Sequence, residues 1–160
     1  MADVFSKQKR SEVMARIRSR GNEATEMALA RLLRANGISG WRRHVEIWGR
    51  AMLPRGPNFK AAQQRRPTRT FSVRPDFVFR QVRLALFVDG CFWHGCPRHA
   101  TKPKNNRAFW RRKLAANKER DHRVNRSLRR AGWRVLRIWE CELAKRPETC
   151  VRRIEKTLKL

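Results

Sequence analysis

The stretch of sequence that decides the fold is Leu84-Ala-Leu-Phe-Val-Asp-Gly-Cys-Phe-Trp-His-Gly-Cys-Pro-Arg-His99. Its first five residues are apolar, and an apolar run of this length is typical of a buried strand because it is too short for a buried helix. The strand leads into a glycine-containing bend that carries cysteine, histidine and two adjacent aromatic residues. We interpret this arrangement as a strand that ends in a functional site.

The cysteines of this bend predict a metal site. Cys91, Cys96 and His99 can each supply a ligand, and Cys141 follows a later apolar stretch. Two or three ligands from one loop and one from a distant element suit a tetrahedral structural zinc site, and thiolates favour zinc over magnesium or calcium. The alternative is that Cys91 and Cys141 are small buried apolar residues, an interpretation that fits Cys150 better than a ligand role does.

The charge of the chain indicates a polyanionic partner. The 160 residues include 40 Lys and Arg against 13 Asp and Glu, which gives a formal net charge of +27. Nucleic acid is the polyanion that such a charge favours. A hydrophobic fraction of 41% with six tryptophans excludes a wholly disordered basic tail.

Length and composition predict a single domain over residues 1–160 with a real hydrophobic core. No stretch approaches the roughly 20 apolar residues that span a bilayer. The first residues lack the apolar region of a signal peptide, so we expect an intracellular, cytoplasmic protein that associates with the nucleoid and not with a membrane. Disulfides are rare in that compartment, which also favours metal binding by the clustered cysteines.

The hydrophobic pattern predicts a mixed α/β domain. Helices are expected over 11–19, 22–36 and 107–131 and from about 147 onward, and strands over 41–45, 75–79, 83–89 and 133–139. Strands 75–79 and 83–89 are close enough to form a hairpin. Residues 49–70 are rich in proline, glutamine and arginine, and we interpret them as a long basic loop that is either a solvated insertion or an arm that contacts DNA.

Asp76 and His94 are candidates for the chemistry of the site. Asp76 opens an apolar strand directly after Pro75, where a buried carboxylate is costly unless it binds something positive. Mg²⁺ takes oxygen ligands, and it would polarise a phosphodiester. His94 is then the general base for an attacking water. The alternative is that Asp76 is a turn former and His94 a surface or packing residue.

Three longer motifs carry a family resemblance. The segments 74–79 (Arg-Pro-Asp-Phe-Val-Phe), 87–94 (Phe-Val-Asp-Gly-Cys-Phe-Trp-His) and 132–141 (Gly-Trp-Arg-Val-Leu-Arg-Ile-Trp-Glu-Cys) resemble the very short patch repair (Vsr) endonucleases. These enzymes nick DNA beside the thymine of a T·G mismatch that arises by deamination of 5-methylcytosine. The resemblance implies a restriction-endonuclease-like fold, a mixed sheet flanked by helices, together with a structural zinc site.

The resemblance also implies roles for single residues. Asp76 matches the family's Mg²⁺-binding aspartate, with the backbone carbonyl of Val88 as the second protein ligand, and His94 matches the catalytic histidine. Glu26 and Asp121 match the other acidic residues of the active site. Three aromatic residues match the wedge that enters the duplex beside the mismatch, where unstacking costs least; they are Phe92, Trp93 and Trp110. Packing in the core is the alternative for Phe92 and Trp93.

The chain departs from the family pattern at two places. Some members have a run of histidines after the Phe-Trp-His motif, so Cys96 here replaces a histidine ligand and His99 reaches further to complete the zinc site. The basic insertion at about 46–73 has no counterpart in compact members. The partners that the resemblance implies are double-stranded DNA with a T·G mismatch and proteins of the repair machinery, and we expect a monomer.

Two other functions stay open. The first is a basic zinc protein that binds nucleic acid without cutting it, and the second is an endonuclease of the same fold that reads another lesion or an intact site. Net charge and zinc ligands serve the mismatch nuclease and the pure binding protein equally. Asp76, His94 and Glu26 favour a nuclease, because carboxylates near phosphates weaken a pure binding site.

Overall fold

The computed structural model describes residues 21–50, 70–99 and 105–159. Its centre is a four-stranded sheet with the order β1-β4-β5-β6, formed by β1 (Trp41–Arg43), β4 (Phe77–Phe79), β5 (Leu84–Asp89) and β6 (Arg134–Trp139). The first two pairings are antiparallel, and β5 and β6 are parallel. The hairpin predicted from 75–79 and 83–89 is therefore confirmed as β4 and β5. The expected helix at 11–19 lies outside the described residues.

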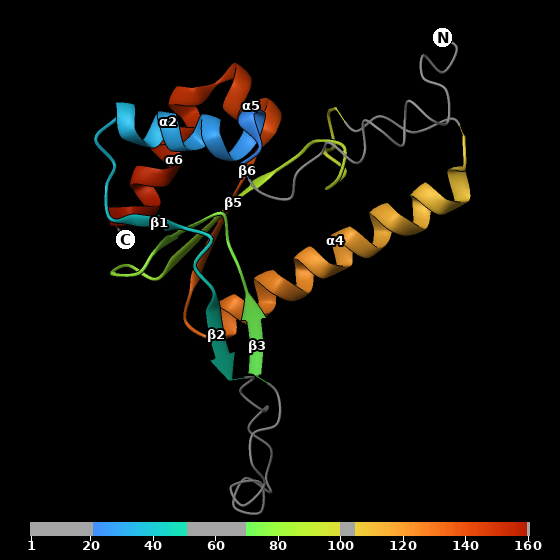
Figure 1. Ribbon diagram of the computed structural model, residues 1–160, viewed down its shortest axis with the longest axis horizontal. Coiled ribbons are helices and arrows are strands. Elements are labelled where there is room, and N and C mark those ends of the chain that lie inside the picture. Colours follow the sequence, from blue (N-terminus) through green and yellow to red (C-terminus); the bar gives the residue numbers. More distant parts are fainter. Residues whose placement is uncertain (1–20, 51–69, 100–104, 160) are drawn as a thin grey trace, which may run out of the picture.

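Four helical segments cover one face of this sheet (Figure 1). They are the π-helical turn η1 (Glu23–Met27), α2 (Ala28–Ala35), α5 (Glu140–Lys145) and α6 (Pro147–Lys159). Leu29 and Leu33 of α2 and Ile154 of α6 are fully buried against Phe77 and Leu86 of the sheet. Asn22 caps η1, because its side chain accepts a hydrogen bond from the backbone N–H of Ala24. The helices expected over 22–36 and from 147 are confirmed, whereas α5, with only six residues, is too short to show a helical period.

The long helix α4 (Arg107–Arg130) connects β5 to β6 and confirms the predicted helix at 107–131. Its C-terminal part packs on the other face of the sheet, where Leu128 joins Val78 and Ala85 in a second, smaller core. Leu128 is the one buried residue of α4, all of which the structure describes. The N-terminal part of the helix extends away from the sheet (Figure 1).

The structure corrects the boundaries of the predicted basic loop at 49–70. Residues at both of its ends form strands, β2 (Ile47–Arg50) and β3 (Thr70–Val73), which pair as an antiparallel ribbon that projects from the domain (Figure 1). Ile47 and Val73 pair within the ribbon and pack into the second core. Each strand is four residues long and finds its partner some twenty residues away, so the local pattern could not predict the pairing. Residues 51–69 lie outside the described part of the chain.

The fold class is the predicted one, a mixed α/β sheet flanked by helices. The connection from β5 through α4 leads to the parallel edge strand β6, so β5 and β6 both end at the same edge of the sheet. Across 21–50, 70–99 and 105–159, we found no helix that is long and apolar enough to cross a membrane.

Candidate active site and metal centre

A cleft of about 700 Å³ opens at the edge of the sheet where β5 ends. Residues from η1, β3, β5, β6 and α4 line it, so the β2–β3 ribbon and the long helix α4 both contribute to its walls. Four carboxylates face this cleft: Glu26, Asp76, Asp89 and Asp121. His94 and several cations share the lining; the cations are Arg74, Lys113, Arg120 and Arg137. The cleft therefore combines an acidic centre with basic groups.

Asp76 stands where β4 begins, beside β5. Its Oδ2 accepts a hydrogen bond of 2.8 Å from the backbone N–H of Val88. The N–H and C=O of one strand residue point to the same side, so the Val88 carbonyl faces the side on which Asp76 lies. Burial, with the nearby carboxylates of Glu26 and Asp89, raises the pKa of Asp76 to about 6 against the effect of the Val88 hydrogen bond. A carboxylate in such surroundings favours a bound cation.

Glu26 is buried on η1 at the wall of the cleft. One of its oxygens, Oε2, accepts hydrogen bonds from the backbone N–H of Gly21 and from Arg43, each at 3.0 Å. The ring Nε2 of His44 is also 3.0 Å from this oxygen. His44 has a left-handed backbone (φ 52°), and its N–H donates to the Asp76 carbonyl, so it joins the two acidic residues through both backbone and side chain. The predicted pair Glu26 and Asp76 therefore belongs to one connected cluster.

His94 and Asp121 form the second half of the cleft. The ring Nδ1 of His94 lies 2.6 Å from Oδ2 of Asp121, which α4 carries. An ionised carboxylate only accepts, so Nδ1 carries the proton of this contact, and the neutral form of the ring has its lone pair on Nε2. The Asp89 carboxylate lies 3.6 Å from the same Nδ1. Burial and the nearby Asp121 raise the pKa of Asp89, although Arg137 and His94 favour its ionised form.

The structure brings together all four residues predicted for the chemistry, and it adds three that the sequence reasoning missed. The predicted residues Asp76, His94, Glu26 and Asp121 all line the cleft. The missed residues are His44, Asp89 and Arg137. Asp89 could have been found, because it ends a buried strand just as Asp76 begins one. The partners of His44 and Arg137 depend on strand pairing, which leaves no local signal.

The three residues predicted as a wedge form one aromatic cluster beside the cleft. The ring of Phe92 lies 5.1 Å from both Trp93 and Trp110, and those two are 6.0 Å apart. Phe109, which the sequence reasoning did not single out, extends the cluster at 5.4 Å from Trp110 and is 53% exposed. The cluster joins the bend after β5 to the N-terminal part of α4, and none of its members packs in either core.

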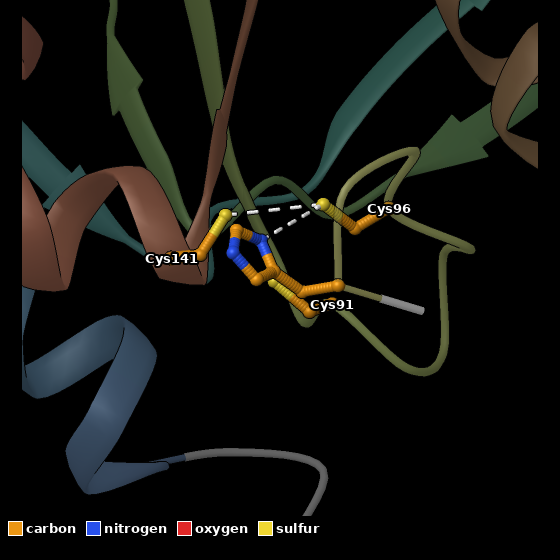
Figure 2. Close-up of side chains that lie close together, drawn as sticks. Cys91, Cys96 and Cys141 are labelled. Atoms are coloured by element: carbon orange, nitrogen blue, oxygen red, sulfur yellow. Dashed lines mark hydrogen bonds between the residues drawn. The ribbon is translucent and has the colours of Figure 1, made fainter. Parts of the chain in front are cut away.

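The four predicted zinc ligands also converge (Figure 2). Cys91 and Cys96 from the bend and Cys141 from α5 point toward one another, and His99 completes the group with all four ligand atoms within 4.8 Å of each other. The Sγ atoms of Cys96 and Cys141 are 3.8 Å apart. Two sulfurs bound to tetrahedral zinc at about 2.3 Å each lie roughly 3.8 Å apart, whereas a disulfide needs about 2.05 Å. The donor set and its spacing therefore fit zinc.

The thiols of this cluster differ in acidity. Burial opposes ionisation of Cys96, but hydrogen bonds from the backbone N–H of Arg98 and from His99 outweigh it and lower its pKa to about 6. Burial and the sulfur of Cys141 raise the pKa of Cys91 to about 12. A metal ion would therefore bind Cys96 readily as a thiolate, whereas its binding to Cys91 would have to displace a proton. Cys150 lies apart in the core, where burial raises its pKa to about 11.

The bend that carries both sites requires a glycine at position 95. Gly95 has a left-handed backbone (φ 64°), and a Cβ at this position would lie 2.5 Å from Cε of Lys118. Lys118 on α4 thus packs directly over the bend, and the side chain of Asn117 donates a 3.0 Å hydrogen bond to the Trp93 carbonyl. The bend after β5 is consequently fixed to α4 as well as to the cysteine cluster.

The acidity of Asp76 gives a prediction for the metal-free protein. We expect Asp76→Asn in the presence of chelator to raise the free energy of unfolding at pH 8 by about 1–3 kcal/mol, because it removes a buried charge. The folded pKa of about 6 exceeds the ordinary 3.8, so ionisation destabilises the fold increasingly between these values and fully above pH 6. Below pH 3.8 the two proteins should unfold alike. Urea titrations at both pH values test this, and equal stability at pH 8 would contradict it.

Comparison with known proteins agrees with this geometry. The sequence profile of the family described as DNA mismatch endonuclease Vsr matches residues 49–100, which include Asp76, His94 and three of the four cluster ligands. The chain is 35% identical to DNA mismatch endonuclease Vsr of Escherichia coli K12 over 144 residues, which is 89% of this chain and 76% of the relative.

Two nicking enzymes are similar over a shorter stretch. The chain is 56% identical over 70 residues to type II nicking enzyme V.NaeI of Lentzea aerocolonigenes and 49% identical over 72 residues to type II nicking enzyme V.XorIIP of Xanthomonas oryzae. These matches span 42% and 52% of the two enzymes, about half of each. The restriction-endonuclease-like architecture, the convergent site and the match to the Escherichia coli protein over most of both chains together place this chain in the Vsr DNA mismatch endonuclease family.

Proposed function

We propose that the protein is a Mg²⁺-dependent DNA endonuclease that nicks one strand beside the thymine of a T·G mismatch and so starts very short patch repair. The observation that carries the proposal is the convergence of four carboxylates and His94 in a single cleft with basic groups around it. Family membership supports the reaction class, and the aromatic cluster beside the cleft supports the choice of substrate.

Charge favours DNA as the substrate. The net charge of +27 attracts any duplex, and α4 carries many exposed cations, among them Arg111, Arg112 and Arg123, together with Arg120 at the cleft. Contacts with phosphates position a duplex without reading its sequence. The helix α4 and the β2–β3 ribbon both border the cleft. A DNA backbone held along α4 would therefore pass over Asp76 and His94.

The donor set of the cleft fits Mg²⁺. We infer that Asp76 and the Val88 carbonyl would hold the ion, since both are oxygen donors on the same side of β5. When bound, Mg²⁺ would polarise the phosphodiester and stabilise the charge that develops in the transition state. Glu26, fixed through one oxygen by Arg43 and His44, is one of the two carboxylates whose charge acts on Asp76.

His94 supplies the proton transfer. Its Nδ1 is occupied by Asp121, so the lone pair on Nε2 is free to accept a proton from a water molecule. As the water oxygen attacks phosphorus, the proton passes to Nε2 and one P–O ester bond breaks. The Asp121 carboxylate then stabilises the imidazolium that forms, as a second group behind a general base does.

The aromatic cluster provides a way to sense the mismatch. A flat side chain can replace the stacking lost when a base step opens, and opening costs least at a mispaired step. Phe92 and Trp93 lie two residues and one residue before His94 in the same bend, and Trp110 faces them from α4. Insertion of these rings would therefore set the position of the strand relative to the general base.

Zinc would serve the structure of the bend. Cys91 and Cys96 flank Phe92–His94, and Cys141 on α5 ties both to the sheet. A metal held by these ligands with His99 contributes its binding free energy to folding. We propose zinc as a structural ion that fixes the bend and not as a participant in the cleavage step.

A second candidate is an endonuclease of the same fold that nicks DNA at another lesion or sequence. The similarity to proteins named type II nicking enzymes supports this second candidate. The third possibility, binding without cleavage, fits the cleft less well, because four carboxylates next to a phosphate backbone weaken binding unless a cation lies between them.

Cleavage of defined duplexes tests the proposal. We expect the protein to nick a T·G duplex with Mg²⁺, to leave the T·A counterpart uncut and to lose activity in chelator. His94→Ala should slow nicking by roughly 10²–10⁴-fold as expected for loss of a general base, and Asp76→Ala should abolish it while duplex binding persists. His122→Ala is the control. His122 directly follows Asp121 on α4, but its side chain is exposed and does not line the cleft. Equal cleavage of both duplexes would favour the second candidate, and binding without cleavage would favour the third.

Metal analysis tests the zinc site. We expect about one zinc per chain from the tetrahedral four-ligand set, and Cys96→Ser should release it and lower the melting temperature. Cys150→Ser should retain the metal, because Cys150 lies in the core and outside the cluster. A purified protein without zinc, whose melting chelator leaves unchanged, would contradict the proposal. His99→Ala alone tests whether the exposed fourth ligand is required.

The roles of wedge and backbone contacts can be separated by salt titration. Trp93→Ala should reduce the preference for T·G over T·A duplex and leave the salt dependence of binding nearly unchanged. Arg111→Ala with Arg112→Ala, on the exposed side of α4, should weaken binding to both duplexes and make the salt dependence shallower by about one unit of slope per lost phosphate contact. If Trp93→Ala weakened both duplexes equally, Trp93 would be better described as a packing residue.

A further inference from the structure

Arg137 connects two of the four acidic groups of the cleft, Asp89 and Asp121. It extends from β6, and its Nη1 donates to Oδ1 of Asp89 at 2.6 Å while its Nη2 donates to Oδ1 of Asp121 at 3.2 Å. The third nitrogen, Nε, donates to the side-chain oxygen of Asn125 at 3.0 Å. Each of the three guanidinium nitrogens therefore has a partner, and these partners belong to β5 and α4.

The guanidinium is itself held in place. It lies over the ring of Phe87 at 4.5 Å from the ring centre, and the Arg137 side chain is 19% exposed. The backbone is fixed as well, because the carbonyl of Arg137 accepts a 3.0 Å hydrogen bond from Arg153 of α6. A planar, stacked and nearly enclosed arginine is a rigid element, unlike an arginine on the surface.

Asp121 divides its two oxygens between His94 and Arg137. Oδ2 contacts the ring Nδ1 of His94, and Oδ1 contacts the guanidinium. The contact with Arg137 therefore fixes the rotation of the carboxylate and with it the direction in which His94 presents Nε2. Asp89 is the competing acceptor, at 3.6 Å from the same ring nitrogen, and Arg137 binds the oxygen of Asp89 that would otherwise be available to His94.

We propose that Arg137 is a positioning residue of the cleavage reaction. It favours the hydrogen bond of His94 with Asp121 over one with Asp89, and so keeps Nε2 of His94 directed toward the scissile phosphodiester. The inference rests on the proposed nuclease function. Arg137 does not need to touch the substrate for this role, since it acts through the two carboxylates. A purely structural role, in which Arg137 only neutralises buried acids of the fold, is the alternative that the experiment must separate.

Single-turnover cleavage of the T·G duplex at saturating protein measures the role directly. Arg137→Ala should lower the rate by about 10²-fold, the loss that follows when a reacting group is misplaced, while the dissociation constant for the duplex changes little. Arg137→Lys keeps the charge but has one ammonium for two carboxylates and Asn125, so it should fold and still cleave slowly. Arg134→Ala is the matched control, because Arg134 lies on the same strand and binds the carbonyls of Val82 and Thr157 away from the cleft.

A double-mutant cycle distinguishes positioning from stability. If Arg137 acts through His94, Arg137→Ala should have almost no further effect on the rate in a His94→Ala background. Arg134→Ala should reduce stability and leave the rate of the folded protein near that of the parent. Additive losses for Arg137 and His94, or a normal rate for both Arg137 variants, would overturn the proposal.

Nuclear magnetic resonance gives a readout that does not depend on cleavage. The Nδ1 proton of His94, held by Asp121, should give a slowly exchanging downfield signal in the parent and in Arg134→Ala, and Arg137→Lys should shift or lose it. An unchanged signal in Arg137→Lys would overturn the positioning role. If the parent shows the signal but cuts no duplex, the nuclease proposal fails while the placement of His94 by Arg137 is still measured.

Discussion

The parallel pairing of β5 with β6 is the constraint on which both sites depend. Its register sets Val88 beside Ile138 and Asp89 beside Trp139, so both strands end together and everything that follows them starts from one edge of the sheet. The bend with Cys91 and His94 leaves from β5, and α5 with Cys141 leaves from β6. A shift of one residue would turn Arg137 to the opposite face of the sheet and separate it from Asp89 and Asp121.

The cysteine cluster and the cleft share a single short bend. Cys91 and Cys96 stand at its two ends, and Phe92–His94 occupy the positions between them. Glu140 adds a further connection, because its carboxylate accepts a 3.1 Å hydrogen bond from the backbone N–H of Cys91. A change in the cysteine cluster would therefore also move the aromatic residues and the histidine, so the proposed metal binding, base stacking and proton transfer would depend on one another.

Features that depend on residues close together in the sequence could be predicted from it, whereas those that depend on pairing between distant segments could not. The strands β4, β5 and β6 and the helices α4 and α6 have strong local patterns and were predicted, and the convergence of Cys91, Cys96 and His99 with Cys141 was predicted from ligand chemistry. The β2–β3 ribbon was missed because its pairing is distant in sequence. Arg137 was missed because an arginine in an alternating strand is ordinarily an exposed residue, and only the strand register shows that it lies over Phe87 between two carboxylates.

The shape of α4 has a consequence for its dynamics. Leu128, near the C-terminal end, is the buried anchor of this helix, whereas near the other end Trp110 contacts the bend and Phe109 packs on Trp110 and is largely exposed. The free energy of local opening therefore decreases along the helix toward its N-terminus, because fewer apolar contacts must be broken there. Amide hydrogen exchange would be graded in the same direction. The aromatic residues of α4 thus lie on the part of the helix that is expected to open most readily, so a duplex entering the cleft as proposed would meet a compliant edge and would order the first turns of α4 against the bend.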